Sequence, residues 1–535
     1  MSRLPARCVR CVSALSLAAF VLAALPVAVR AEEAATTIDQ AVSTKLREMG
    51  AAPSDVCSDA VFVRRVYLDV TGRLPTVAKS KAFLASEDPA RREKLIDELL
   101  ASDAFADYWA LKWGDLLRIK SEFPSNLWPN AVQAYHGWVR RSIRDNTPYD
   151  QFVRELLTAT GSNFREPPVN YYRAFLKRDA EDIADVTALL FMGARIQCAR
   201  CHEHPSEPWT QEDHKKFSAF FYQLQYKKSK EWKEEIVYVN TRRRMRDAET
   251  KELVPPTPPG GEPLDVKYDD DLRVAFADWL TAKDNPWFAR AAVNRIWFWL
   301  MGTGIVSPAD DIRPSNPPSN PELLALLERE FIDHGYDTRR LFRLILNSKT
   351  YQRSAATSDT NAMAAGHFSH YRVRRLPAET LLDAIGDVTR QWDTYRSNIP
   401  EPFIVMPEAT RATCLADGSV SLPFLELFGR PPRDTAFEQD RDNELSARQT
   451  LYLLNSGDVY NKINRSPRIA RWLSEKTATA VVIDELYHAA LSRPPTEEEQ
   501  RALTEHIDRE GANRRNVLAD AMWAVLNTKE FVFNH

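Results

Sequence analysis

Helix-start signals followed by apolar stripes recur along this sequence, and they limit its possible folds more than any other feature. Thr210 begins one such pattern, because an acidic residue three positions after a hydroxyl residue forms a capping box. The apolar residues behind it share one helix face: Phe217, Phe220, Phe221 and Leu224. Comparable starts precede apolar stripes at Asp88-Pro89, Thr147-Pro148, Asn285-Pro286, Asn320-Pro321, Leu376-Pro377 and residues 496–499. The sequence therefore predicts a mainly α fold.

Residues 236–268 interrupt this helical pattern. Ile236 begins four residues that are typical of a strand, a charged turn follows, and Leu253 begins a short return strand. A run rich in proline and glycine starts at Pro255 and indicates a stiff connection. We therefore predict a short β-hairpin followed by a Pro-rich linker.

The length of the chain allows more than one hydrophobic core. It has 535 residues, of which 44% are hydrophobic, and single cores stop growing well below that size. Because the hairpin and linker at residues 236–268 give the clearest boundary, we expect two helical domains, at residues 32–235 and 269–535.

The first residues have the features of a secretory signal. Three arginines precede an apolar run at residues 12–29, and Val29 and Ala31 have the small side chains that a signal peptidase recognises. Pro26 interrupts the run, which favours a signal peptide at residues 1–31 over an N-terminal membrane anchor. We expect an exported protein, periplasmic or extracellular, with no transmembrane span once the signal is removed.

Composition and charge exclude several classes of function. The formal net charge is -3, so a broad nucleic-acid-binding face is not expected and nucleic acid is not a predicted partner. The chain has 17 glycines against 33 prolines and lacks both the GxGxxG and GxxxxGK[ST] motifs. Dinucleotide-binding and P-loop folds need glycine where the backbone approaches phosphate, so both are disfavoured.

One motif in the sequence indicates a cofactor. Cys198, Cys201 and His202 form a CxxCH motif, which is the attachment motif of c-type haem. Two thiols bind the porphyrin and the adjacent histidine binds the iron. This pattern predicts a single haem c, a role in electron transfer or a haem-dependent step, and a redox partner protein or cytochrome. Met192 precedes the motif at the end of an apolar helix, where we expect core packing rather than a second axial ligand.

The cysteines also allow other interpretations. Cys198 and Cys201 could instead form a disulfide or a redox-active dithiol, although the βαβ surroundings of CxxC oxidoreductases are missing. Outside the motif and the signal segment, Cys57 and Cys414 form either a long-range disulfide or two buried thiols.

A metal site is the main alternative to haem. Zinc or another transition metal could be bound by residues from Cys198, Cys201, His202, His204 and His214. In that case the chain is a metal- or disulfide-stabilised scaffold that binds a partner or polysaccharide without catalysis. A hydrolase with the three histidines on a metal is a third possibility. Whether the protein is an enzyme stays open.

Several segments together resemble a known family. They are residues 198–221, 62–69 and 149–157 in the first half and residues 285–297, 311–318 and 428–433 in the second. The chain is similar to the planctomycete cytochrome-c-associated family of exported proteins with two paired domains of unknown function. The resemblance implies that the family's CxxCH corresponds to Cys198, Cys201 and His202, with His204 following. At residues 432–438 the sequence departs from the family, which would have a cysteine there, so a metal or disulfide role of that stretch is in doubt.

Overall fold

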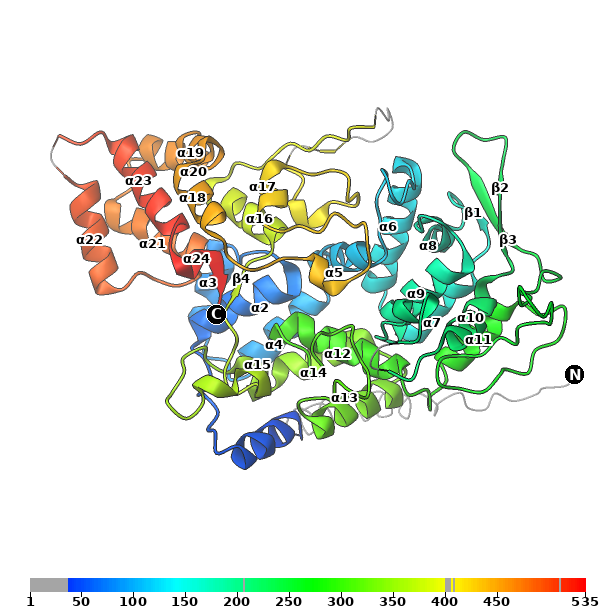
Figure 1. Ribbon diagram of the computed structural model, residues 1–535. Helices are drawn as coiled ribbons and strands as arrows, with labels where there is room; N and C mark the ends of the chain where they lie inside the picture. Colours follow the sequence, from blue (N-terminus) through cyan, green and yellow to red (C-terminus); the bar gives the residue numbers. More distant parts are fainter. Residues whose placement is uncertain (1–36, 205–206, 400–405, 408, 510) are drawn as a thin grey trace, which may run out of the picture.

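A computed structural model describes residues 37–204, 207–399, 406–407, 409–509 and 511–535. It confirms the mainly α fold (Figure 1). The predicted signal peptide at residues 1–31 lies outside the described residues. Among the helices inside them, none combines the length and the apolar character needed to cross a membrane.

The first half of the chain is a series of short helices. They are α2 (Asp59–Thr71), α3 (Val77–Leu84), α4 (Arg91–Leu100), α5 (Asp103–Leu116), α6 (Pro129–Arg144), α7 (Tyr149–Thr158), α8 (Asn170–Arg173), α9 (Ala180–Phe191) and α10 (Gln211–Ser218). The capping box at Thr210 is confirmed, because its hydroxyl accepts from the Asp213 amide and the Asp213 carboxylate accepts from the Thr210 amide. The helix predicted to start at Asp88 exists but begins later, at Arg91. The Asp88 carboxylate accepts from the Ala90 amide in the turn before it.

The second half continues in the same way. Its helices are α11 (Leu272–Leu280), α12 (Phe288–Met301), α13 (Pro321–Asp333), α14 (Thr338–Asn347), α15 (Lys349–Gln352), α16 (Ala378–Thr389), α17 (Pro423–Leu427), α18 (Ala447–Asn455), α19 (Gly457–Asn464), α20 (Pro467–Ser474), α21 (Thr479–Leu491), α22 (Glu497–Ile507), α23 (Arg514–Leu526) and α24 (Lys529–Val532). Asn320 caps α13, and Thr496 forms a capping box with Glu499 at α22. Both predicted starts are therefore confirmed.

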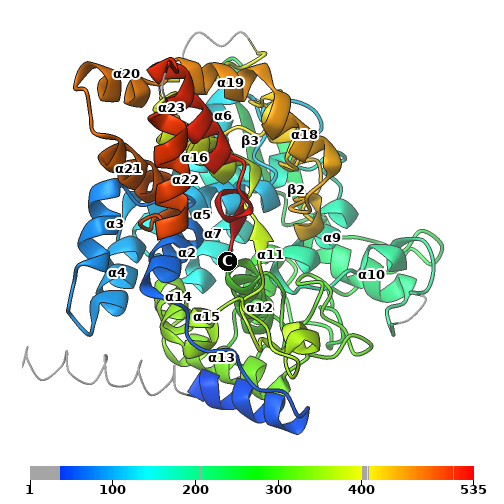
Figure 2. The same cartoon turned by 90° about the vertical axis from the view of Figure 1, so that its left-hand side faces the viewer.

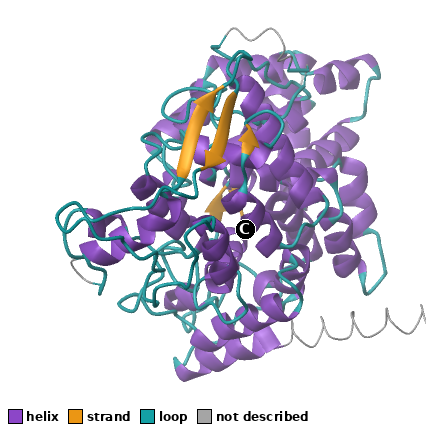
Figure 3. Cartoon of the chain, turned by 90° about the vertical axis from the view of Figure 1, so that its right-hand side faces the viewer, coloured by secondary structure: helices purple, strands orange, loops and turns teal. Residues whose placement is uncertain are grey.

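The predicted hairpin exists with a different partner strand. β3 (Glu235–Val239) pairs antiparallel with the preceding strand β2 (Leu224–Lys228), and β1 (Gly161–Ser162) covers its other edge (Figure 3). Leu253 forms only an isolated bridge with Arg246. The predicted return strand is wrong because prolines follow it at once, and proline cannot donate to a ladder.

Two hydrophobic cores fill the molecule, and they do not divide it at the Pro-rich linker. The first core combines apolar residues between Ile38 and Tyr371 with Ala416 and Ala436, so it includes segments on both sides of residues 236–268. The second core combines residues between Leu376 and Val532 with Leu68 and Leu74 of the first half. The division between the cores therefore falls near residue 375, after α15.

The end of the chain is attached to its beginning by a buried arginine. Arg64 on α2 donates to the carbonyl oxygens of Ala490 at 2.8 Å and Phe531 at 2.8 Å. Burial lowers the pKa of Arg64 to about 10, with Glu530 opposing the shift, so the group is still charged at neutral pH. The C-terminal helices consequently lie beside α2 and α3 (Figure 2).

The four cysteines of the described chain are free. Cys57 is buried in the first core, and the Cys414 sulfur accepts from Arg73 at 3.3 Å. The structure thus has thiols at these two positions and not the long-range disulfide.

Candidate functional site

The CxxCH motif lies on an exposed turn and not on a helix. The residues Gln197–Arg200 form a 3-10 turn, and the amides of Cys201 and His202 approach the Cys198 carbonyl oxygen at 3.3 and 3.4 Å. Both cysteine side chains belong to exposed residues. The apolar helix before the motif, α9, ends at Phe191.

Gly193 sets the direction in which the chain leaves α9. Its φ is +63°, and its carbonyl oxygen accepts from the amide of Ile312, 2.7 Å away. A Cβ at this position would lie 2.8 Å from the Ile312 Cδ1 atom. A residue without a side chain is therefore needed both for the left-handed backbone and for the close approach of the second half.

Gly193→Ala should lower the free energy of unfolding by about 2–4 kcal/mol, since the left-handed backbone and the added methyl group each cost about 1–2 kcal/mol. Urea denaturation measures this loss. Gly50→Ala is the matched control, because Gly50 has φ +69° but a Cβ added there would have no other atom within 4 Å. Equal losses in the two variants would contradict the proposed contact with Ile312.

Arg200, between the two cysteines, anchors the turn to the start of α9. Its guanidinium lies 2.7 Å from Asp182 and 3.2 Å from Asp179, which is the N-cap of α9. From the other side, Gln211 on α10 donates to the Cys201 carbonyl oxygen at 2.5 Å. The turn is therefore fixed to two helices while its thiols face solvent.

His202 has one ring nitrogen engaged and one available. Its Nδ1 atom lies 2.7 Å from the Glu203 carbonyl oxygen. A carbonyl can only accept, so Nδ1 bears the proton and Nε2 has the free lone pair. Among the described residues Nε2 has no hydrogen-bond partner. Metal-bound histidines commonly have this arrangement, in which a carbonyl fixes the ring through its other nitrogen.

The other two histidines of the predicted metal site are engaged elsewhere. His204 accepts from the Glu207 amide through Nδ1 at 3.1 Å, and His214 is buried and donates from Nε2 to Asp185 at 2.7 Å. Within the described part of the chain, no three Cys, His, Asp or Glu side chains are grouped so as to bind a metal ion. The structure therefore does not bring the five predicted ligands together.

The space beside the motif is too small to enclose a haem. A hollow of about 250 Å³ adjoins the turn and is lined by Gln197, by apolar residues of α9, including Val186 and Leu189, and by residues 434–437. Pockets that enclose drug-sized ligands measure about 300–1,000 Å³, so this hollow is too small to surround a porphyrin. A haem on Cys198 and Cys201 would be partly exposed to solvent.

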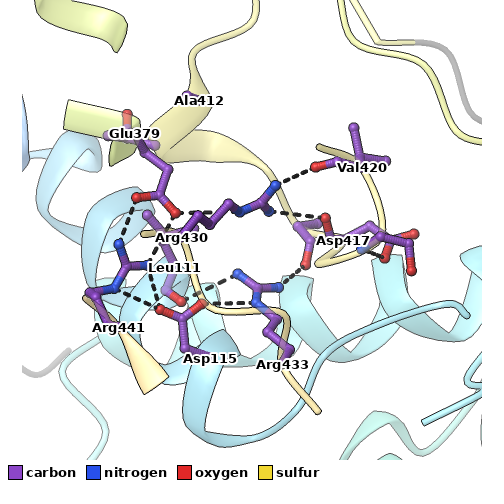
Figure 4. Close-up of polar contacts among 12 residues, drawn as sticks. Leu111, Asp115, Glu379, Ala412, Asp417, Val420, Arg430, Arg433 and Arg441 are labelled. Carbon is purple, nitrogen blue, oxygen red and sulfur yellow. Dashed lines mark hydrogen bonds and ion pairs between the residues drawn. The ribbon is translucent and has the colours of Figure 1, made fainter. Parts of the chain in front are cut away.

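A buried network of arginines and carboxylates includes Arg433 and Arg441 of the loop at residues 431–445 (Figure 4). Asp115 on α5 pairs with Arg433 at 2.9 Å and with Arg441 at 2.6 Å. Glu379 on α16 pairs with Arg441 at 2.7 Å and with Arg430 at 3.3 Å. Burial alone would raise the pKa of Glu379, but Arg441 and Arg430 outweigh it and lower the pKa to about 2.

Sequence reasoning missed this network. Residues 432–438 stood out in the sequence only for their absent cysteines, whereas Arg433 in that stretch is completely buried. Asp115 could have indicated a buried ion pair, because this acidic residue lies beside the apolar stripe of Trp109, Trp113 and Leu116. A buried carboxylate needs a cationic partner, but the sequence does not say which one.

The fold and the CxxCH turn define a mainly helical protein with one candidate cofactor site. Residues 37–226 match the family model PSCyt2, a protein of unknown function (DUF1549), and residues 272–507 match PSD1, a protein of unknown function (DUF1553). The chain therefore contains both of these domains, in this order. The first match ends before the predicted linker and the second begins after it. The hydrophobic cores, in contrast, divide further along the chain, near residue 375. No curated protein and no solved structure is significantly similar to the chain.

Proposed function

We propose that Cys198, Cys201 and His202 are a covalent attachment site for one haem c, and that the protein takes part in electron transfer or a haem-dependent step. The orientation of His202 is the main support, because its Nδ1 atom is held by the Glu203 carbonyl and its Nε2 atom has no partner among the described residues. The free, exposed thiols are accessible to attachment. The proposal includes export to the periplasm or cell exterior, where c-type haem is attached.

The residues of the chain would position and expose such a group. When bound, haem supplies one-electron chemistry. Arg200 holds the turn against α9, and the Glu203 carbonyl fixes the tautomer of His202. Because the turn is exposed, a redox protein or cytochrome could approach it without any rearrangement of the fold. Exposure to solvent is one of the factors that set the reduction potential of haem.

Expression of the full chain together with haem-maturation enzymes should give a coloured protein with one covalent haem. The pyridine haemochrome spectrum and the intact mass measure this directly. The variant with Cys198→Ala and Cys201→Ala should lose the haem completely, since both thioether bonds require these thiols. Cys414→Ser is the control and should retain it, because Cys414 lies outside the motif.

A colourless product without haem mass would contradict the proposal. Elemental analysis of that product then separates the remaining interpretations. Zinc without iron would favour a metal-stabilised scaffold for partner or polysaccharide binding, and the absence of both metals would favour a dithiol or disulfide at Cys198 and Cys201.

A further inference from the structure

A second candidate site lies away from the CxxCH turn, in a cavity of about 540 Å³ between the two halves of the chain. Helix α5 contributes Tyr108, Trp109 and Lys112 to its wall, α12 contributes Trp299, and the C-terminal strand β5 (Phe533–Asn534) contributes Asn534. The loop at residues 431–445 closes another side. The volume is within the range of small-molecule sites.

Lys112 is an unpaired cation in this cavity. Its Nζ atom lies 5.5 Å from the centre of the Tyr108 ring, and it has no hydrogen-bond or ion-pair partner among the described residues. Lys120, a little further along the chain, differs in this respect, because its Nζ atom pairs with Asp434 at 2.7 Å. Lys112 is half-buried, and an amine in a cavity wall without a counter-ion is available to a ligand.

The carboxylates around Lys112 are already engaged with arginines. Asp115 and Glu379 bind Arg441, and Glu438 lies 2.9 Å from Arg295. Burial lowers the pKa of Lys112 to about 7, and the nearby Arg441 adds to this decrease, whereas the three carboxylates oppose it. A pKa near 7 instead of about 10.4 raises the neutral fraction of the amine at pH 7 by roughly a thousandfold.

Two acceptor oxygens in the cavity wall also lack hydrogen-bond partners within the part of the chain that the structure describes. Asn534 is 4% exposed, and its Nδ2 atom donates to Asp69 at 2.8 Å while its Oδ1 atom has no hydrogen bond. The Oδ1 atom of Asn443 is likewise buried without a partner. Buried oxygens are normally satisfied, so a ligand with hydroxyl groups would complete both. The indole rings of Trp109 and Trp299 provide apolar walls beside them.

We propose that this cavity binds a hydroxylated aldehyde or ketone and that Lys112 condenses with its carbonyl group to form an imine. The neutral amine adds to the carbonyl carbon, so a C–N bond forms and the carbonyl oxygen takes up a proton. The resulting hydroxyl then leaves as water, and the nitrogen loses its remaining proton as the C=N bond forms. Water supplies the proton that the leaving oxygen takes up. Amines beside a second cation are known to react in this way.

Reductive trapping of the full chain tests the proposal. The protein is incubated with glyceraldehyde and sodium cyanoborohydride, and adducts are located by peptide mass spectrometry. We expect Lys112 to be modified at least about tenfold faster than Lys120 at pH 7, with a rate that reaches half its maximum near pH 7. Lys112→Arg should lose this adduct, whereas Lys120→Arg should retain it.

Propanal serves as the second probe because it has the same reactive group without hydroxyls. It should modify Lys112 several-fold more slowly than glyceraldehyde, and equal rates would overturn the hydroxyl part of the proposal. Equal modification of Lys112 and Lys120, or a rate that rises only near pH 10, would overturn the imine. These readouts come from the unaltered chain, so they hold even if Lys112→Arg folds poorly. They are independent of haem content, so a colourless protein can still pass this test.

Discussion

Residues 37–226 expressed alone should fail to fold cooperatively, even though they are the whole segment that matches one family domain. Their core is shared with the second half of the chain. Trp109 packs against Phe342 with ring centres 4.5 Å apart and against Trp299 at 5.1 Å. In the same way, Phe217 lies 5.3 Å from Phe276.

The energetic reason is the loss of these partners. Burying one large apolar side chain contributes about 1.5–3 kcal/mol, whereas a whole domain is stable by only about 5–15 kcal/mol. A fragment that lacks α11 to α15 leaves many such side chains exposed, so its native state loses more than its total stability. We expect a dye-binding, partly collapsed fragment without a sharp thermal transition.

Circular dichroism melting and binding of an apolar dye measure this outcome. Residues 37–371 are the matched control, because they contain nearly all of the first core, and they should show a cooperative transition below the melting temperature of the intact chain. Co-expression of residues 37–226 with residues 227–535 should restore a folded complex. A sharp transition of 37–226 alone, close to that of the intact protein, would contradict the shared core.

Asp115→Asn should be among the most destabilising single changes in the protein, with a loss of about 3–5 kcal/mol in the free energy of unfolding. The Asp115 carboxylate neutralises two buried guanidinium groups, those of Arg433 and Arg441. The side chain of Arg433 is 0% exposed, so it cannot recover water when the charge of its partner is removed. Asparagine has nearly the same shape, so the loss reports charge and not packing.

Urea denaturation of the variant measures this effect. Glu98→Gln is the control, because the Lys79–Glu98 pair is about as short, at 2.6 Å, but both side chains are 55% exposed. Exposed pairs contribute only about 0–1 kcal/mol. A difference of less than 1 kcal/mol between the two variants would show that the buried network is not stabilised by its charges.

The helix starts show which structural features can be predicted from short stretches of sequence. The capping boxes at Thr210 and Thr496 involve groups only three residues apart, so the sequence contains both partners of each contact. At Asp88 the local signal predicted the helix but not its first residue, since α4 begins at Arg91. The return strand at Leu253 failed because prolines follow it, and the partner of β3 is instead the preceding strand β2.

By itself the sequence determined the mainly α fold, the order of the two domains and the spacing of Cys198, Cys201 and His202. These features depend on contacts between near neighbours, whose geometry the backbone fixes. Only the tertiary structure decided that the cores divide after α15, that Arg433 neutralises Asp115, and that Lys112 lies unpaired in a cavity. Those features join residues hundreds of positions apart, and the choice among many possible long-range partners is made by packing the whole chain at once.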